Sequence, residues 1–253
     1  MLKKAILFIL IILGCTNSSH AQYEQFYKEI GIMAGPVFLK SDFGERGDID
    51  NFTKNNGFTV GGFYYMTFIE NFESIRENFK MRLEASYTSV ELQHYGKYVD
   101  NPSNSLFTRQ LRAMKGKTTM GTFGVQVEYF PNKVDDYNRG GSPLSPFLGA
   151  GVQINAFTSE VSSELGRIGN LSTTPKKYMD GYKNDDGMAV SLSASAGTRL
   201  KLGDYHAIVA EMRLQYYFSD WIDGLNPNNK VYTENKSNDW SAGILLGYIY
   251  YIN

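Results

Sequence analysis

Apolar residues occupy every second position in eight segments of the chain, and a polar stretch follows almost every segment. Side chains alternate between the two faces of a β-strand, so this period predicts strands with one apolar face and one small or polar face. The segments are 29–39, 58–68, 80–92, 118–130, 146–157, 188–202, 206–218 and 240–252. We therefore predict eight antiparallel strands.

The connections between these segments alternate in length. Long polar loops are predicted at 40–57, 93–117, 158–187 and 219–239, and shorter links at 69–79, 131–145 and 203–204. Long loops at one end and short turns at the other are typical of outer-membrane barrels, and each segment is long enough for a tilted strand to cross a membrane. The predicted fold class is all-β: an eight-stranded antiparallel up-and-down transmembrane β-barrel, closed by pairing of the last strand with the first.

Two features indicate that the apolar face of this barrel points outward. A soluble eight-stranded barrel would turn its apolar face inward, but the polar face here is rich in Gly, Ser and Thr, which fit the narrow interior of such a barrel. Aromatic residues also gather at both ends of the strands, as in the girdles of membrane barrels. The short-turn end has Phe68, Tyr129, Phe130, Tyr205, Tyr248, Tyr250 and Tyr251, and the long-loop end has Tyr216, Phe218, Trp221 and Trp240. We expect lipid contact at Ala194, Ala210 and Ile244, and inward-facing side chains or backbone at Ser193, Glu211 and Gly243.

Composition narrows the class of protein. The 253 residues include 18 Tyr, 16 Phe and 25 Gly, a content that suits a β-protein. Mean hydropathy is -0.32, which is too polar for a bundle of membrane helices. The net charge of -1 argues against a nucleic-acid partner, because such a protein needs a basic surface.

The N-terminus has the features of an export signal. Lys3 and Lys4 precede an apolar run at 5–13, and Ser19-His20-Ala21 supplies the small residues of a cleavage site. We therefore predict a signal peptide at 1–21 and a single barrel domain at 22–253. An alternative is cleavage before Cys15, because Leu13-Gly14-Cys15 resembles a lipoprotein box.

Charged residues fall on the inward face of the predicted strands. They are Arg82, Glu84, Glu128, Arg199, Glu211 and Arg213. Three cations and three anions in a narrow barrel can pair and fill the lumen, whereas a selectivity ring is the functional alternative. We favour a structural charge network, because eight strands leave no room for an aqueous channel.

The loops offer few candidates for chemistry. His94, at the base of the second long loop, would need a serine and an acid nearby to act in hydrolysis, and no spacing identifies such partners. Asp42, Glu45, Asp48 and Asp50 are oxygen ligands without the spacing of a calcium loop. We expect no catalytic residue, no cofactor and no metal. Loop 158–187 carries Leu165, Ile168 and Leu171, so we expect it to pack on the barrel mouth or against a partner.

The first segment and loop carry a resemblance to known proteins. Residues 29–36 (EIGIMAGP) and 40–48 (KSDFGERGD) resemble a largely uncharacterised family of small outer-membrane proteins of flavobacteria. More distantly, the chain is similar to PorG-like barrels, which are associated with the type IX secretion and gliding machinery. The resemblance implies an origin in the Bacteroidota and a place in the bacterial outer membrane, and it implies no active site.

Three functions remain open on this sequence. The leading hypothesis is a structural or interaction barrel with a plugged lumen and long extracellular loops, an accessory of a type IX secretion or gliding machine. A small-molecule carrier or narrow pore is the first alternative, and an outer-membrane lipid-modifying enzyme is the second. The expected partners are outer-membrane lipid, the barrel-assembly machinery during insertion, and secretion or gliding proteins.

Overall fold

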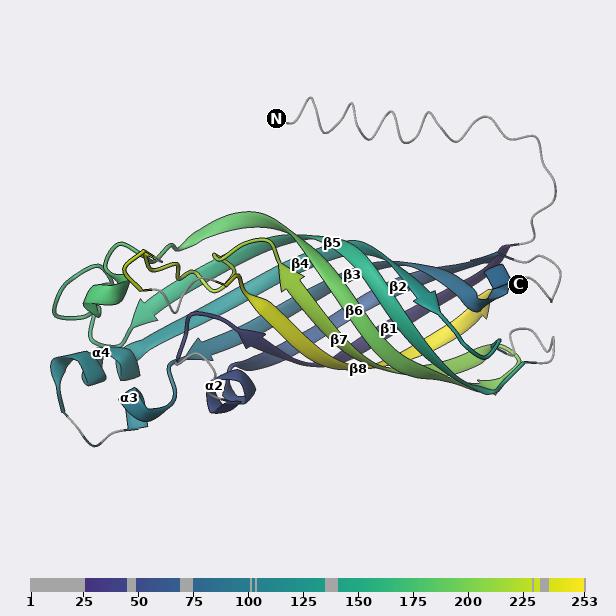
Figure 1. Cartoon of the computed structure of the whole chain (residues 1–253), viewed down its shortest axis with the longest axis horizontal. Coiled ribbons are helices and arrows are strands. Elements are labelled where there is room, and N and C mark those ends of the chain that lie inside the picture. The colour runs from purple at the N-terminus through teal and green to yellow at the C-terminus, as the bar shows by residue number, and fades with distance from the viewer. Residues whose placement is uncertain are drawn as a thin grey trace, which may run out of the picture.

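The computed structural model describes residues 26–44, 49–68, 75–100, 102, 104–134, 141–228, 230–232 and 237–252, so the predicted signal peptide lies outside the described residues. Eight strands form in this part of the chain: β1 (Phe26–Lys40), β2 (Asn56–Phe68), β3 (Phe79–Gln93), β4 (Met114–Tyr129), β5 (Leu144–Ser163), β6 (Asp185–Gly203), β7 (His206–Tyr217) and β8 (Trp240–Ile252). Each pairs with the next in antiparallel register, and β8 pairs with β1 to close the barrel (Figure 1). Closure leaves no unpaired sheet edge among these strands. The predicted fold class is confirmed.

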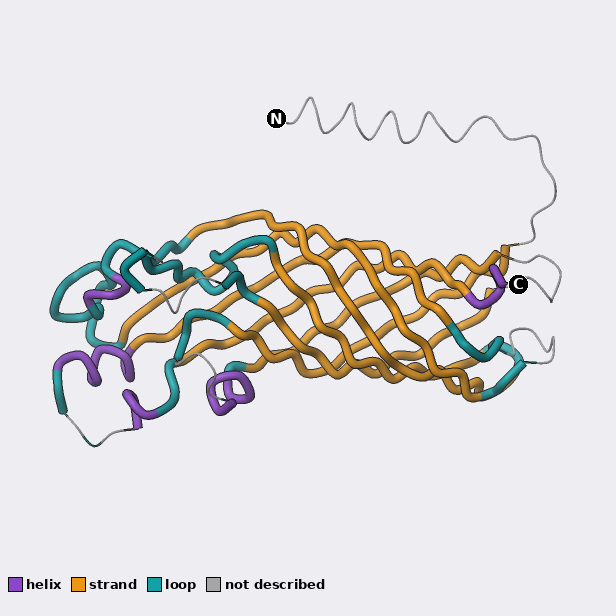
Figure 2. Tube along the Cα trace, in the orientation of Figure 1, coloured by secondary structure: helices purple, strands orange, loops and turns teal. Residues whose placement is uncertain are grey.

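Short helices lie in the connections at both ends of the barrel. The strand pattern did not predict these helices. Figure 2 shows α2 (Ile49–Lys54), α3 (Lys97–Asp100), α4 (Leu106–Ala113) and η4 (Lys176–Tyr178) among the long loops, and η2 (Ile75–Asn78) at the opposite end. In the described residues, none of the helices has the length and apolar character needed to span a membrane.

Strands β4 and β5 extend beyond their predicted bounds of 118–130 and 146–157 at the long-loop end. Their backbone ladder continues through Lys115–Ser162 and Lys117–Glu160 pairs. The side chains of these four residues point outward and are exposed and polar. Met114, the first residue of β4, is buried. Strands β4 and β5 therefore extend beyond the apolar outer belt. The predicted bounds were too short because they were drawn from the outward apolar residues alone, and these stop at the edge of the belt.

The barrel is apolar outside and polar inside. Ile32, Val152, Leu192, Leu214 and Leu246 are among the exposed apolar side chains that form the outer belt. Ala194 and Ile244 are exposed and Ala210 is half-buried, while Ser193, Glu211 and Gly243 are buried. The facing of these six residues is the one that the period of two predicts.

Three aromatic residues do not belong to the predicted girdles. Phe130 and Tyr251 are buried inside the barrel, because each directly follows an outward-facing tyrosine and neighbouring strand residues point to opposite faces. Trp221 packs against the apolar cluster under the long loops, so its ring is turned away from the outer belt. Tyr129, Tyr205, Tyr216, Phe218, Tyr248 and Tyr250 are exposed. Trp240 is half-buried against Phe52, with 4.9 Å between the ring centroids. For Phe68 the structure describes only the backbone.

The interior is layered along the barrel axis. An apolar cluster near the short turns includes Phe63, Tyr65, Phe130 and Phe147, and it surrounds the charged residues of the lumen. A second cluster, under the long loops, includes Phe43, Leu92, Met114, Tyr178 and Ile222. Between them lies a polar layer with a cavity of only about 30 Å³, room for little more than a water molecule.

Candidate functional site

Five of the six charged residues predicted for the lumen form one ion-pair network, and the sixth, Arg199, pairs with a further residue, Glu29. Arg82 lies at the centre of this network: Nη1 is 2.8 Å from Oε1 of Glu128 and 2.7 Å from Oε2 of Glu211, and Nη2 is 3.1 Å from Oε2 of Glu84. Arg213 joins Glu84 at 2.7 Å and Glu211 at 2.8 Å. All of these side chains are buried, so the pairs are held away from water.

Two further residues, Glu29 and Lys80, extend the network and were missed by the sequence prediction. Glu29 pairs with both Lys80 and Arg199, and both partners are buried. The signal was present, because Lys80 has the same strand parity as Arg82 and Glu84. With these two, the described network holds Arg82, Arg199, Arg213 and Lys80 against Glu29, Glu84, Glu128 and Glu211, so its formal charge cancels.

Neutral polar groups support the network and fill the layer above it. Tyr65 donates its hydroxyl to both carboxylate oxygens of Glu128, at 2.9 and 3.1 Å, and Gln153 donates to Glu84 at 2.6 Å. Higher in the lumen, Asn155 accepts from Thr122 at 2.9 Å and from Gln215 at 3.0 Å. The lumen is therefore crossed by hydrogen-bonded side chains from facing strands.

The long loops cover the mouth of the barrel. Loop 158–187 packs there through Ile168 and Tyr178, which are both buried, and the Tyr178 hydroxyl donates to the backbone carbonyl of Asp42 at 3.1 Å. The side chain of Gln110 on α4 donates to the carbonyl of Leu171 at 2.7 Å. The other two apolar residues of the loop, Leu165 and Leu171, are exposed.

Acidic residues lie under this cover. Asp223 accepts the backbone N–H of Asp42 at 2.7 Å and that of Leu225 at 2.8 Å, and Asp239 accepts the N–H of Ile222 at 3.0 Å. Burial first, and then the neighbouring carboxyls, raise the pKa of Asp223 and Asp239 well above the usual range. Burial alone raises the pKa of Asp220 to about 6.

The four oxygen ligands considered for calcium are not seen as a set. Asp42 is buried, Glu45 and Asp48 lie outside the described residues, and so does the side chain of Asp50. In the described part of the chain, no group of three or more His, Cys, Asp or Glu side chains is placed to hold a metal ion.

His94 is buried between the rings of Phe43 and Tyr178, with centroid distances of 4.8 and 5.4 Å. Its Nδ1 accepts the backbone N–H of Gly44 at 2.8 Å. Burial, together with the charge of Lys177, lowers the pKa of His94 to about 3, so the ring is neutral and its proton lies on Nε2. That nitrogen is buried and has no hydrogen-bond partner among the described residues. Leaving such a donor unpaired costs about 1–3 kcal/mol.

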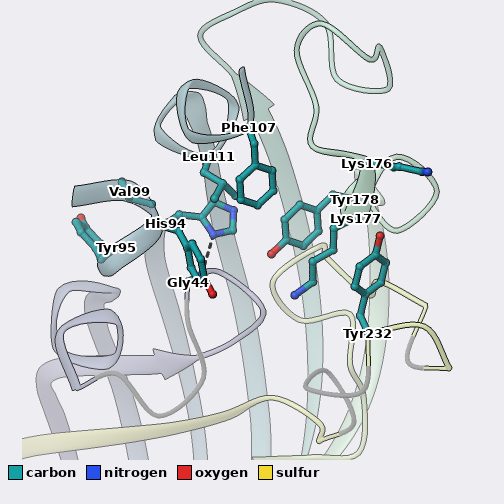
Figure 3. Close-up of a pocket in the computed structure, with 11 residues that line it drawn as sticks. Gly44, His94, Tyr95, Val99, Phe107, Leu111, Lys176, Lys177, Tyr178 and Tyr232 are labelled. Atoms are coloured by element: carbon teal, nitrogen blue, oxygen red, sulfur yellow. Dashed lines mark hydrogen bonds between the residues drawn. The ribbon is translucent and has the colours of Figure 1, made fainter. Parts of the chain in front are cut away.

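A cavity of about 570 Å³ opens beside His94 (Figure 3). Its walls come from five parts of the chain: the first long loop, the segment after β3, helices α3 and α4, the η4 turn, and the last long loop. The lining residues are Gly44, His94, Tyr95, Tyr98, Val99, Phe107, Leu111, Lys176, Lys177, Tyr178 and Tyr232. We refer to it as the mouth pocket. Of these lining residues, the sequence singled out only His94 as a candidate for chemistry and offered Phe107 and Tyr178 as loop aromatics that can anchor contacts, because no spacing predicts which loops meet.

Helix α4 provides one wall of the mouth pocket, and the local sequence explains why a helix forms there. Ser105 precedes the helix and its hydroxyl accepts the N–H of Thr108 at 3.2 Å, which satisfies one free N–H of the first turn. Leu111 packs in the apolar cluster under the long loops and Ala113 is also buried, whereas Leu106 and Phe107 remain exposed. The cap and the buried side chains fix the helix, and Phe107 lines the mouth pocket.

A closed antiparallel barrel pairs its backbone groups internally, and an apolar outer belt presents apolar side chains outward; a lipid bilayer requires both. The protein is an outer-membrane β-barrel of eight strands.

Comparison with known proteins finds similarity in structure rather than in sequence. The sequence matches no protein-family model and no curated relative. Among the solved structures that match, three illustrate the similar strand arrangement. A major outer membrane protein from Thermus thermophilus has 13% identity and a TM-score of 0.48, covering 92% of this chain and 100% of that chain. Neisserial surface protein A has 13% identity and a TM-score of 0.45, covering 90% and 99%. Ail, the attachment invasion locus protein of Yersinia pestis, has 14% identity and a TM-score of 0.43, covering 90% and 99%.

Proposed function

We propose that this protein is a non-conducting interaction barrel of the outer membrane, which acts through its ordered long-loop end. The observation that carries the proposal is the charge network: eight buried, mutually paired side chains span the lumen. Removing one partner would leave a buried charge uncompensated, so the network is a fixed part of the fold. A channel would need these side chains to move out of the way together.

We infer the orientation in the membrane from the end of the barrel at which β1 starts. The C-terminus lies at the short-turn end, and β1 starts there as well (Figure 1). In our proposal the exported chain leaves these ends in the periplasm, and the long loops face the exterior. The ordered cover of the mouth is then the surface that external ligands and partners meet.

We propose that the protein is not an enzyme. In a Ser-His-acid arrangement, Nδ1 of the histidine donates to the acid. In His94 that nitrogen accepts a backbone N–H instead. A pKa of about 3 also makes this ring a weak base at neutral pH. A lipid-modifying activity centred on His94 would have to overcome both features.

The finer proposal concerns the partner. The resemblance of residues 29–36 and 40–48 to flavobacterial and PorG-like barrels supports a role as an accessory of a type IX secretion or gliding machine. Such a machine would be met at the periplasmic turns. Ile75, on η2, is exposed there and offers a contact point.

Planar-bilayer recording tests the main proposal. Purified wild-type protein is expected to give no stable single-channel steps, alongside a general porin as positive control. Steady, ion-selective steps from the wild-type monomer would establish the pore alternative.

Site-specific cross-linking tests the partner. A photo-reactive phenylalanine analogue in place of Ile75 should cross-link to a component of the secretion or gliding machinery in cells. The same analogue in place of Leu171, at the other end of the barrel, should not. Equal yields at both positions, or none at position 75, would reject this partner.

A further inference from the structure

The mouth pocket is large enough for a small molecule and is built from ordered parts of the chain. Its volume of about 570 Å³ lies within the roughly 300–1,000 Å³ of sites for small ligands. The α4 wall is capped, and the η4 wall is tied by the hydrogen bond from Tyr178 to Asp42.

One wall presents an unsatisfied donor. Nε2 of His94 carries the ring proton, is buried, and has no partner among the described residues. Figure 3 shows Nδ1 directed at Gly44 and the other ring nitrogen, Nε2, on the side of the ring that faces Phe107, another residue of the pocket lining. A buried donor calls for an acceptor, and a ligand oxygen would supply it.

The opposite wall presents positive charge. Lys177 Nζ lies 5.5 Å from the ring centroid of Tyr178 and 5.6 Å from that of Tyr232, so its ammonium is held against aromatic faces. Lys176 is exposed next to it. The charge of Lys177 contributes to the low pKa of His94, so the two groups are close enough to interact electrostatically, and both line the mouth pocket.

The remaining lining is apolar and mostly flat. Phe107 and Tyr98 are both about half exposed, and Val99 and Leu111 close the side formed by the helices. Exposed aromatic faces in a concave site favour stacking of a ring, with centroids about 4.5–7 Å apart.

We propose that the mouth pocket binds a small organic anion with a flat apolar ring, such as an aromatic carboxylate. The anionic group accepts from His94 Nε2 and faces Lys177, and the ring packs on the exposed face of Phe107. The proposal rests on the proposed function only in taking the long-loop end as the binding face. Its test does not measure conductance, so either proposal can fail alone.

The test is calorimetric titration of the full-length protein in zwitterionic nanodiscs with 2-naphthoate. We expect a single site with a dissociation constant of about 20 µM to 1 mM, the range for a ligand of this size. Two probes separate the parts of the site. 2-Naphthalenemethanol keeps the ring without charge, and inorganic phosphate keeps charge without the ring. Both should bind at least about ten-fold more weakly.

Variants locate the site. His94→Asn keeps an acceptor near the position of Nδ1 for Gly44 and removes the Nε2 donor, and Lys177→Met removes the charge at similar length. Each should weaken 2-naphthoate binding about ten-fold. Lys183→Met is the matched control: Lys183 is an exposed lysine at the same end, paired with Asp185 and outside the pocket lining, and its loss should leave affinity unchanged.

Three results would overturn the proposal: equal binding of acid and alcohol, no binding of 2-naphthoate, or the same affinity in Lys177→Met as in wild type. If His94→Asn fails to fold, as judged by heat-modifiable gel mobility, Phe107→Ala replaces it. That change removes an exposed ring from the wall and should weaken binding of the naphthyl group without loss of fold.

Discussion

The two ends of the barrel interior handle buried ionisable groups in opposite ways. Near the short turns, each carboxylate of the charged network faces a guanidinium or ammonium group, and Arg82 alone contacts three of them. Under the long loops, Asp223 faces backbone N–H donors and other carboxyls, and His94 keeps a donor without a described partner. The first region has its charge compensated within the protein. In the second region, the protonation and hydrogen bonding of these groups depend on pH and on any ligand that binds. Binding and a response to pH are therefore expected at the long-loop end.

Breaking the compensated region should have the largest effect. Arg82→Met removes the central cation and leaves Glu84, Glu128 and Glu211 with fewer partners in a buried site. We expect a loss of about 3–5 kcal/mol in the free energy of unfolding, measured by urea titration in lipid vesicles. Lys183→Met, which breaks an exposed pair, should cost less than about 1 kcal/mol. Equal stability of Arg82→Met and wild type would mean that the network does not stabilise the fold.

The outer belt gives the next largest effect and checks that the barrel faces lipid. Ile244 is exposed on β8, and Ile244→Arg should destabilise the protein by about 2–4 kcal/mol near the bilayer midplane. Ile244→Leu should be close to neutral in the same vesicle titration. An arginine variant as stable as the leucine variant would place this face in water.

The strand pattern predicts the compensated region well and the mouth poorly, for a physical reason. A period of two fixes which face each residue takes, so Arg82, Glu84, Glu211 and Arg213 could be assigned to the lumen before their partners were known. Strand register then brings them together. The same rule, applied strictly, would have placed Phe130 inside, because it follows outward-facing Tyr129.

The mouth depends on contacts between loops, which no period records. Helix α4 could have been suspected from Ser105, a residue type that favours helix N-termini, before the amphipathic stretch at 106–113. The meeting of His94 with Lys177 and Tyr232 brings together residues from separate loops, and only the folded barrel sets those distances. The packing of loop 158–187 could be predicted because an apolar residue such as Ile168 is unusual in a solvated loop. In the structure Ile168 is buried in the apolar cluster under the long loops.

A more local effect should come from pH at the long-loop end. Asp223 and Asp239 have a raised pKa when folded, so they keep a proton that the unfolded chain releases above its ordinary pKa. Their contribution is fully present below pH 3.8 and is lost as the pH rises through the folded pKa, at no more than roughly 1.4 kcal/mol per group for each pH unit. Proteolysis within 219–239 should therefore be faster at pH 8 than at pH 5.

A matched variant decides whether the carboxyls cause this response. Asp239→Asn keeps an oxygen that can accept the N–H of Ile222 and cannot ionise. Its loop should be cleaved at rates that differ less between pH 5 and pH 8 than in wild type. Asp185→Asn serves as control, since Asp185 is exposed and pairs with Lys183 at the surface. If the cleavage rate of Asp239→Asn depends on pH as strongly as that of wild type, the Asp239 carboxyl does not cause the pH response.

The smallest effect concerns the α4 wall of the mouth pocket and sharpens the contrast between the two regions. Ser105→Ala removes the hydroxyl that accepts the Thr108 N–H, which should cost about 1 kcal/mol, within the range for loss of an N-cap. Because the helix belongs to the mouth, this loss should appear as faster hydrogen exchange of the amides at 106–113, while the exchange of β3 and β4 amides near Arg82 stays unchanged. Ser105→Asp, which keeps a capping oxygen, should restore protection. Faster exchange throughout the strands in Ser105→Ala would mean that the mouth and the charged network unfold as one unit.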